Sequence, residues 1–139
     1  MKKLSILTIC IVMIITMFTG CSAAEKQALT TGSEWKQSNS KSETDYQIAS
    51  IKDGTIEIYY ASDNGETTTL YWSGTFIAPT TADDPYTWTS TNDHAKTDLS
   101  LLGSSDDTKE ITYDDGLLSY KVGLMGTTTT VKLAMQKQK

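Results

Sequence analysis

The strongest constraint on the fold is a set of short turn signals, each flanked by runs of β-forming residues. Asp53-Gly54 separates "DYQIASIK" from "TIEIYYAS", Asn64-Gly65 precedes "ETTTLYWSGTF", and Asp115-Gly116 separates "KEITY" from "LLSYKV". Asp-Gly and Asn-Gly pairs between such runs are the strongest short-range signal for a β-hairpin. The chain after residue 40 is therefore expected to be all-β.

The hydrophobic pattern sets the pairing of the first and third hairpins. A two-residue turn at Asp53-Gly54 places Ile51 opposite Ile56 and Ala49 opposite Ile58. A two-residue turn at Asp115-Gly116 sets the third register, in which two cross-strand pairs point inward: Tyr113 with Leu118 and Ile111 with Tyr120.

The middle hairpin admits two registers. A two-residue turn at Asn64-Gly65 sets Ile56 and Ile58 against Ser73 and Tyr71, whereas a three-residue loop sets them against Trp72 and Leu70. Burial favours the three-residue loop of residues 63–65, because it puts apolar residues on the same face. On that face Gly74 is expected to mark a bend in the strand.

Further strands are expected at residues 33–38, 86–90 and 127–135, which brings the total to about seven or eight. Between them Ala95, Leu99 and Leu102 fall at helical spacing, with Asn92 or Asp93 as a cap and Gly103 as an end, so one or two helical turns are expected. Meander connectivity favours closure, which hides the sheet edges. The predicted fold is a small antiparallel meander β-barrel, with a two-sheet β-sandwich as the alternative.

The first 20 residues have the pattern of an export signal. Lys2 and Lys3 precede an uncharged, mostly apolar run from Leu4 to Phe18. As a helix this run would span roughly 22 Å at 1.5 Å per residue, short of the ~30 Å hydrocarbon core of a bilayer. A cleaved N-terminal signal helix is therefore favoured over a permanent span.

Small residues then surround Cys21. Phe18-Thr19-Gly20-Cys21 resembles the lipobox of bacterial lipoproteins, in which the cysteine is acylated, by palmitate or a similar chain, and becomes the new N-terminus. The resemblance implies lipidation of Cys21 and a position at the cell membrane, anchored by lipid on its extracytoplasmic side. It also implies three parts: a signal peptide (1–20), a flexible tether (21–32) and one all-β domain (33–139).

Composition and motifs argue against several functions. The chain has 12 lysines, no arginine and 17 acidic residues, so a nucleic-acid partner is not expected. His94 is the only histidine, and no Gly-x-Ser-x-Gly motif occurs. The acidic pairs lack the alternating spacing of a calcium loop and are interpreted as solvated turn residues: Asp83-Asp84, Asp106-Asp107 and Asp114-Asp115. We expect no catalytic residues, metal site or cofactor, and no enzyme activity.

Aromatic residues are the remaining functional clue. Seven tyrosines and three tryptophans are many for one small domain. One interpretation is that Trp72 and Trp88 fill the core and Trp35 closes one end; the other is that Trp35, Trp72, Tyr86 and Trp88 bind a ligand or partner. Gly32-x-x-Trp35 before the hairpins resembles the opening of lipocalin-like barrels, which implies a barrel shape.

Two functions follow as hypotheses. The first is a non-catalytic binding or inhibitory module that acts on a secreted or envelope-reaching protein, such as a lysozyme-type hydrolase, a bacteriocin or a phage factor. A basic target suits the acidic chain, because opposite charge speeds encounter. The second is a lipocalin-like carrier of a small hydrophobic ligand, which requires a cavity lined by tryptophans.

Overall fold

The computed structural model describes residues 29, 32–80 and 84–137, and antiparallel strands dominate this part of the chain. The strands are β1 (Ser33–Gln37), β2 (Tyr46–Lys52), β3 (Thr55–Ser62), β4 (Thr67–Thr75), β5 (Tyr86–Thr91), β6 (Thr108–Asp114), β7 (Leu117–Leu124) and β8 (Thr127–Met135). A 3-10 turn, η1 (Asp63–Gly65), and a one-turn helix, α2 (His94–Thr97), lie between strands.

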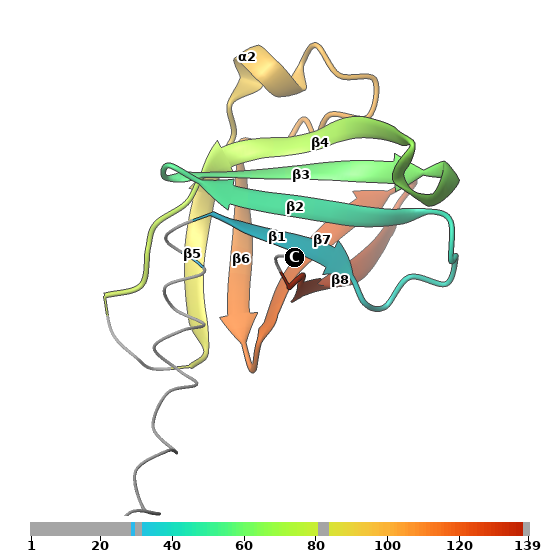
Figure 1. Ribbon diagram of the computed structural model, residues 1–139. Coiled ribbons are helices and arrows are strands. Elements are labelled where there is room, and N and C mark those ends of the chain that lie inside the picture. Colours follow the sequence, from blue (N-terminus) through green and yellow to red (C-terminus); the bar gives the residue numbers. More distant parts are fainter. Residues whose placement is uncertain (1–28, 30–31, 81–83, 138–139) are drawn as a thin grey trace, which may run out of the picture.

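The strands form a meander that is nearly closed into a barrel. Their order in the sheet is β4-β3-β2-β1-β8-β7-β6-β5, so neighbours in sequence are neighbours in space and β1 also pairs with β8. In Figure 1, β2, β3 and β4 run side by side across the view, and β5 and β6 cross them steeply. The predicted all-β meander barrel of seven or eight strands is confirmed, and the sandwich alternative is set aside.

Two of the three predicted hairpin registers are confirmed. Ile51 pairs with Ile56 across the turn at residues 53–54, and Tyr113 pairs with Leu118 across the turn at residues 115–116. In each turn both central residues have positive φ, as a type I′ turn requires: 50° and 74° in the first, 49° and 78° in the second. Local turn chemistry and the burial pattern therefore select the same pairing.

The predicted register of the middle hairpin was wrong. Its inward face was right for Trp72, Gly74 and Phe76, but Tyr71 belongs to the core in place of the half-buried Leu70. Ile58 pairs with Trp72, and Ile56 pairs with Gly74. The ladder starts at Ser62 and Thr67, and it shifts by one residue at a β-bulge beside Tyr59. The loop therefore comprises four residues, 63–66, and not the predicted three, and the bulge adds Tyr71 to β4 between Leu70 and Trp72.

The barrel closes where β4 and β5 meet. Gly74 forms an isolated bridge with Asn92 just beyond the end of β5. A Cβ at Gly74 would lie 2.4 Å from Ser90 Oγ and 2.6 Å from the Thr91 carbonyl oxygen, so the two strands can approach this closely only at a glycine. The glycine that was expected to mark a bend is thus the closure point of the barrel.

The barrel interior holds one hydrophobic core, to which all eight strands contribute. Leu29 and Phe76, which lie outside the strands, also belong to it. Alternation along each strand points every second side chain inward. The most deeply buried large side chains are Leu29, Trp35, Ile51, Ile56, Ile58, Trp72, Ile111, Leu118 and Leu133.

The predicted helix is present but shorter than the apolar spacing suggested. α2 is a single turn that begins after Asp93 and ends at Thr97, six residues before Gly103. Thr97 is the buried residue of this turn, while Leu99 and Leu102 are exposed. The interpretation of Gly103 as the helix end was therefore wrong. The helix ends early because buried polar contacts, and not an apolar helix face, hold this segment against the barrel.

Candidate functional site

The four aromatic residues singled out in the sequence lie on β1, β4 and β5. Trp35, Trp72 and Trp88 are 2, 0 and 4 % exposed, which makes their rings part of the core. Tyr86, at the start of β5, is half-buried. The three indole rings are therefore not available as a surface for a partner, and Tyr86 is available only in part.

The structure brings Trp72 and the two β5 aromatic residues into one region of the interior. Trp72 Nε1 donates to Ser90 Oγ at 3.0 Å, and Trp88 Nε1 donates to the Thr75 carbonyl oxygen at 3.2 Å. Tyr86 stacks on Trp88, with ring centres 5.8 Å apart and planes inclined by 22°. Burial raises the pKa of Tyr86 above its usual value. Each polar atom of the two indoles is thus satisfied within the barrel.

Trp35 makes its contacts with β1 and β6. Its Nε1 donates to Ser33 Oγ at 2.8 Å. Its ring meets the Tyr113 ring edge-on, with centres 6.2 Å apart and an interplanar angle of 80°. Trp35 therefore acts as an interior packing residue in this structure.

Two polar residues inside the barrel were missed by the sequence reasoning. Gln47 is 4 % exposed and Lys109 is 6 % exposed. A signal for both was present, because Gln47 lies two residues before buried Ala49, and Lys109 lies two residues before buried Ile111. Strict alternation would have placed both side chains inside.

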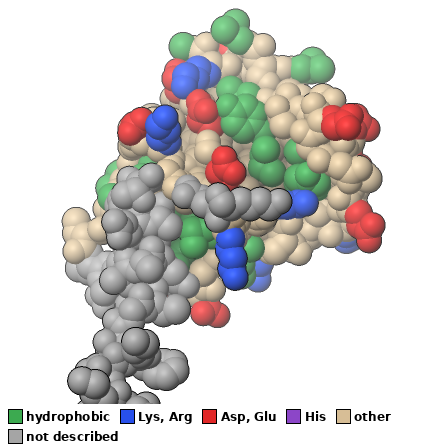
Figure 2. Space-filling view, in the orientation of Figure 1, with side chains coloured by type: hydrophobic (Ala, Val, Ile, Leu, Met, Phe, Trp, Pro, Cys, Tyr) green, Lys and Arg blue, Asp and Glu red, His purple; other side chains and the backbone are tan. Residues whose placement is uncertain are grey.

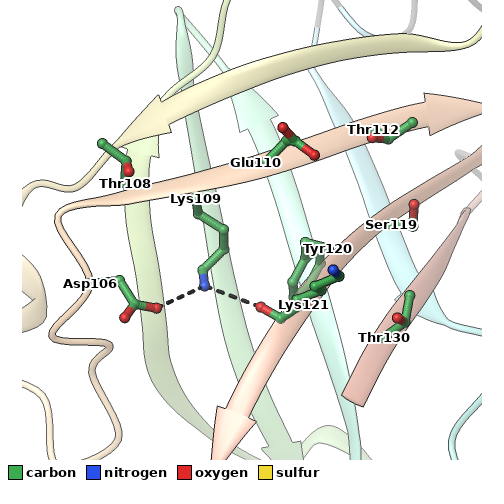
Figure 3. Close-up of a pocket in the computed structure, with 9 residues that line it drawn as sticks. All are labelled: Asp106, Thr108, Lys109, Glu110, Thr112, Ser119, Tyr120, Lys121 and Thr130. Carbon is green, nitrogen blue, oxygen red and sulfur yellow. Dashed lines mark hydrogen bonds and ion pairs between the residues drawn. The ribbon is translucent and has the colours of Figure 1, made fainter. Parts of the chain in front are cut away.

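Lys109 is the buried cation of this interior. Its Nζ donates to Asp106 Oδ2 and to the Lys121 carbonyl oxygen, each at 3.3 Å (Figure 3). The same Nζ lies 5.1 Å from the centre of the Tyr71 ring and 5.0 Å from that of Trp72. Two aromatic faces and two oxygens therefore replace the water that the ammonium group loses.

Gln47 and Tyr120 complete the polar interior. The Tyr120 hydroxyl donates to Gln47 Oε1, and burial raises the pKa of Tyr120 well above its usual value. Within the described residues, every buried side-chain nitrogen and oxygen atom has a hydrogen-bond partner. The polar groups inside the barrel thus satisfy one another without a ligand.

A polar cleft of about 420 Å³ opens on the wall of the barrel between β6 and β7 (Figure 3). The ladder between these strands runs only from the Ile111–Tyr120 pair to the turn, so the strands separate beyond it. Hydroxyl and charged side chains dominate the lining, which suits a polar ligand and not an apolar one. The lining residues are Asp106, Thr108, Lys109, Glu110, Thr112, Ser119, Tyr120, Lys121 and Thr130.

Two further hollows among the described residues are smaller than this cleft. One of about 330 Å³ lies against β1, β2 and β3, and Trp35, Tyr46 and Tyr59 are among its lining residues. Another, of about 360 Å³, lies where β4 meets the start of the α2 segment, beside Gly74 and Asn92. Trp72, Tyr86 and Trp88 line neither of these hollows nor the β6–β7 cleft.

Large apolar side chains project from the segment that follows α2, which we call the leucine loop (residues 98–103). Leu99, Leu101 and Leu102 are 88, 94 and 47 % exposed. Hydrophobic side chains stand out at the top edge of Figure 2, above β4, where this segment lies. A leucine left in water forgoes about 1.5–3 kcal/mol relative to burial, so three of them in four residues require an explanation.

The leucine loop is held in place from below by hydrogen bonds. Ser100 Oγ donates to the Leu70 carbonyl oxygen, and the Ser104 amide donates to the Tyr71 carbonyl oxygen at 2.8 Å. Gly103 allows the chain to turn back on α2, because a Cβ there would lie 1.9 Å from the Thr97 carbonyl oxygen. The loop is thus fixed against β4 while its leucines face solvent.

Asn92 and Thr97 form the buried support of the same segment. Asn92 Nδ2 donates to the carbonyl oxygens of Ser104 and Asp106 at 3.0 and 2.8 Å. Thr97 Oγ1 donates to Asn92 Oδ1 at 2.9 Å. Since Asn92 and Thr97 are both buried, these bonds are shielded from water and set the path of residues 92–106.

His94 joins two aspartates on the outside of the segment. Its Nδ1 lies 3.1 Å from Asp98 Oδ1 and its Nε2 lies 3.0 Å from Asp107 Oδ1. These hydrogen bonds raise the pKa of His94 above its ordinary value. Beside it Lys96 Nζ lies 2.9 Å from Glu57 Oε1, and the hydrogen bond to Lys96 lowers the pKa of Glu57. Both ring nitrogens of His94 are thus engaged in holding the segment.

Within residues 29, 32–80 and 84–137, no group of three or more His, Cys, Asp or Glu side chains is arranged to hold a metal ion. In the same part of the chain, no helix has the length and apolar character that crossing a membrane requires. Cys21 and the predicted signal peptide lie outside the described residues.

No protein-family model matches this chain, and no curated protein or solved structure is similar to it at a significant level.

Proposed function

We propose that this chain is a cell-envelope lipoprotein whose β-barrel is a non-catalytic binding or inhibitory module for another protein. The target class is a basic protein that reaches the envelope from outside, of the kind that lysozyme-type hydrolases, bacteriocins and phage factors represent. Lipidated Cys21 would hold the barrel at the extracytoplasmic side of the cell membrane, within reach of such a protein.

One observation carries this proposal: large apolar side chains lie outside the barrel, while the three tryptophans are buried in the core and the buried polar side chains of the described residues are satisfied. Trp72 is fully buried, whereas Leu101 is 94 % exposed. A small-molecule site has the opposite character, with apolar residues lining a concave space. Exposed apolar clusters rimmed by polar residues are typical of protein-binding surfaces.

Charge supports a basic partner. The chain carries a net charge of −5, and loss of Lys2 and Lys3 with the signal peptide makes it −7. Opposite charge raises the rate of encounter and discriminates against acidic proteins. The same charge disfavours a nucleic-acid partner.

The experiment is inhibition of lysozyme by the purified full chain. We expect the rate of cell-wall hydrolysis to fall with increasing protein, and lysozyme to be captured by the immobilised chain. Lysozyme with succinylated lysines, which has lost its positive charge, serves as the control and should not be captured. If native lysozyme is neither inhibited nor captured, the proposal loses its best-defined target.

The alternative function is a carrier of a small hydrophobic ligand. It requires a cavity lined by Trp35, Trp72 and Trp88, and the hollows described above do not bring these residues together. Tryptophan fluorescence distinguishes the two functions, because a ligand inside the barrel would change the emission of the buried indoles. A saturable change with lipids or small apolar compounds would favour the carrier.

A further inference from the structure

We infer that the leucine loop is the docking element of this protein, and that it inserts Leu99, Leu101 and Leu102 into an apolar pocket of a basic partner protein. This inference rests on the proposed function and adds to it the surface that makes the contact.

The leucine loop is held in an exposed conformation. α2 ends at Thr97, whose side chain is buried, and the chain leaves the helix before the exposed Leu99, Leu101 and Leu102. Ser100 is bonded to the carbonyl oxygen of Leu70 between the projecting leucines, so the loop cannot fold back without loss of that bond. The conformation that exposes the leucines is therefore the one that the polar contacts select.

The leucine loop is also ordered before any partner binds. Asn92 and Thr97, both buried, fix the start of the segment, and Gly103 contacts the backbone of Thr97 closely at its end. A loop that is already ordered loses little conformational entropy when it binds. Apolar anchors that enter a partner's pocket are the usual centre of a binding interface.

Acidic side chains lie around the leucine loop. Asp98 precedes Leu99, and His94 connects Asp98 to Asp107; the two carboxylate side chains are 67 and 92 % exposed. Asp106 lies beside them, with its side chain 60 % exposed. The nearby cations are already paired, Lys96 with Glu57 and Lys109 with Asp106. The rim is therefore acidic and complements a basic surface.

The acidic rim also weighs against a lipid bilayer as the occupant. Bacterial and other cellular membranes carry anionic lipids, which attract basic segments and repel acidic ones. The loop between residues 98 and 103 contains no lysine, arginine or tryptophan that would anchor it at a headgroup layer. A basic protein with an apolar pocket suits both features, because the pocket accepts the leucines and the basic residues face the acidic rim.

The test compares two variants of the purified full chain for binding to native lysozyme. One variant carries Leu99→Ser, Leu101→Ser and Leu102→Ser in the leucine loop. The matched control carries Ile77→Ser, Leu124→Ser and Met125→Ser, which removes three other exposed apolar side chains at different places in the chain. Because all six residues are exposed, both variants should unfold at the same denaturant concentration as the wild type.

We expect the leucine-loop variant to bind lysozyme at least about tenfold more weakly, mainly through faster dissociation, and the control variant to bind as the wild type does. Raising the salt concentration from about 0.1 M to about 1 M should slow association of the wild type and of the control. Succinylated lysozyme should not bind.

Each contrary result has a distinct meaning. Wild-type binding that the leucine-loop variant retains in full would overturn the docking inference and leave the proposed function standing. A wild type that does not bind native lysozyme would overturn the proposed function for this target and the docking inference with it. Leucine-dependent adsorption to vesicles of neutral phosphatidylcholine, or leucine-dependent self-association in sedimentation, would show that a bilayer or a second copy is the occupant and overturn the inference.

Discussion

Lys109 shows how a single charged residue fits inside a small barrel. Its ammonium group is enclosed by Tyr71, Trp72 and the Lys121 carbonyl oxygen, and its one carboxylate partner, Asp106, is mostly exposed. A buried ion pair of this kind often contributes little net stability, because desolvation offsets the attraction. We therefore expect Lys109 to stabilise the wall of the β6–β7 cleft more through the packing of its side chain than through its charge.

We therefore predict that Lys109→Met changes the free energy of unfolding by less than about 1 kcal/mol, because the methionine side chain keeps the contacts with the aromatic rings. Lys109→Glu should destabilise by about 3 kcal/mol or more, because it buries an anion beside Asp106 and two ring faces. Urea unfolding of the two variants measures the difference. If both variants lost the same free energy of unfolding, the ammonium charge of Lys109 would itself hold β6 and β7 together.

His94 makes the leucine loop sensitive to pH. The hydrogen bonds to Asp98 and Asp107 raise the pKa of His94 in the folded protein above the ordinary value of 6.5. A raised folded pKa means that the stabilisation is complete below pH 6.5 and is lost as pH rises through the folded pKa. We predict that amide hydrogen exchange of residues 94–103, corrected for its intrinsic pH dependence, becomes faster as pH rises above 6.5 and passes the raised pKa of His94.

A His94→Gln variant provides the control for this pH effect. Its loop should exchange at a rate that does not change over the same range, because glutamine does not titrate. If the wild type and His94→Gln show the same pH profile, His94 does not set the stability of the loop.

At the level of elements, the sequence predicts paired strands well and connections poorly. The turn at residues 53–54 and the turn at residues 115–116 fix their registers through local chemistry, and alternation alone places Ile56 and Ile58 inside. The bulge beside Tyr59 carries no such local signal, because no Gly or Pro marks the position in β3 or β4 at which the register shifts.

The segment from residue 92 to residue 107 shows the same limit. The spacing of its leucines favours a helix, but the buried side chains of Asn92 and Thr97 determine the path. Helical spacing indicates an apolar face only where another element covers that face. The sequence pattern alone does not indicate that these leucines remain exposed to solvent.

Asn92 is the residue on which this segment depends most. We predict that Asn92→Ala lowers the free energy of unfolding by about 2 kcal/mol, because it leaves the carbonyl oxygens of Ser104 and Asp106 and the Thr97 hydroxyl without their buried partner. It should also speed hydrogen exchange in residues 94–104 more than in β1 or β8. An Asn92→Ala variant as stable as the wild type would contradict this account of the loop.

At the level of the whole molecule, the barrel could be predicted but its functional surface could not. Alternation indicates which face Trp35, Trp72 and Trp88 occupy, yet it does not say whether the interior is filled or hollow. Burial of 0 to 4 % shows that these rings are core in the folded chain. The surface that carries the proposed function, the leucine loop, is defined only once the three-dimensional path of the chain is known.

The lipid anchor is a prediction for the complete chain. Cys21→Ala should leave an uncleaved precursor that incorporates no labelled fatty acid, because the acylated cysteine is also the site at which the signal peptide is removed. Gel mobility and palmitate labelling of the wild type and the variant measure this. A mature product of unchanged size in the variant would refute the lipobox interpretation.

The central claim, that an anchored barrel binds an incoming basic protein, is tested most directly by lysis of whole cells. Lysozyme-sensitive bacteria that produce the full chain should lyse more slowly with lysozyme than cells with an empty vector. Cells that produce Cys21→Ala or the leucine-loop triple variant at equal amounts should lose this protection. Equal lysis rates for the wild type and the empty vector would contradict the account.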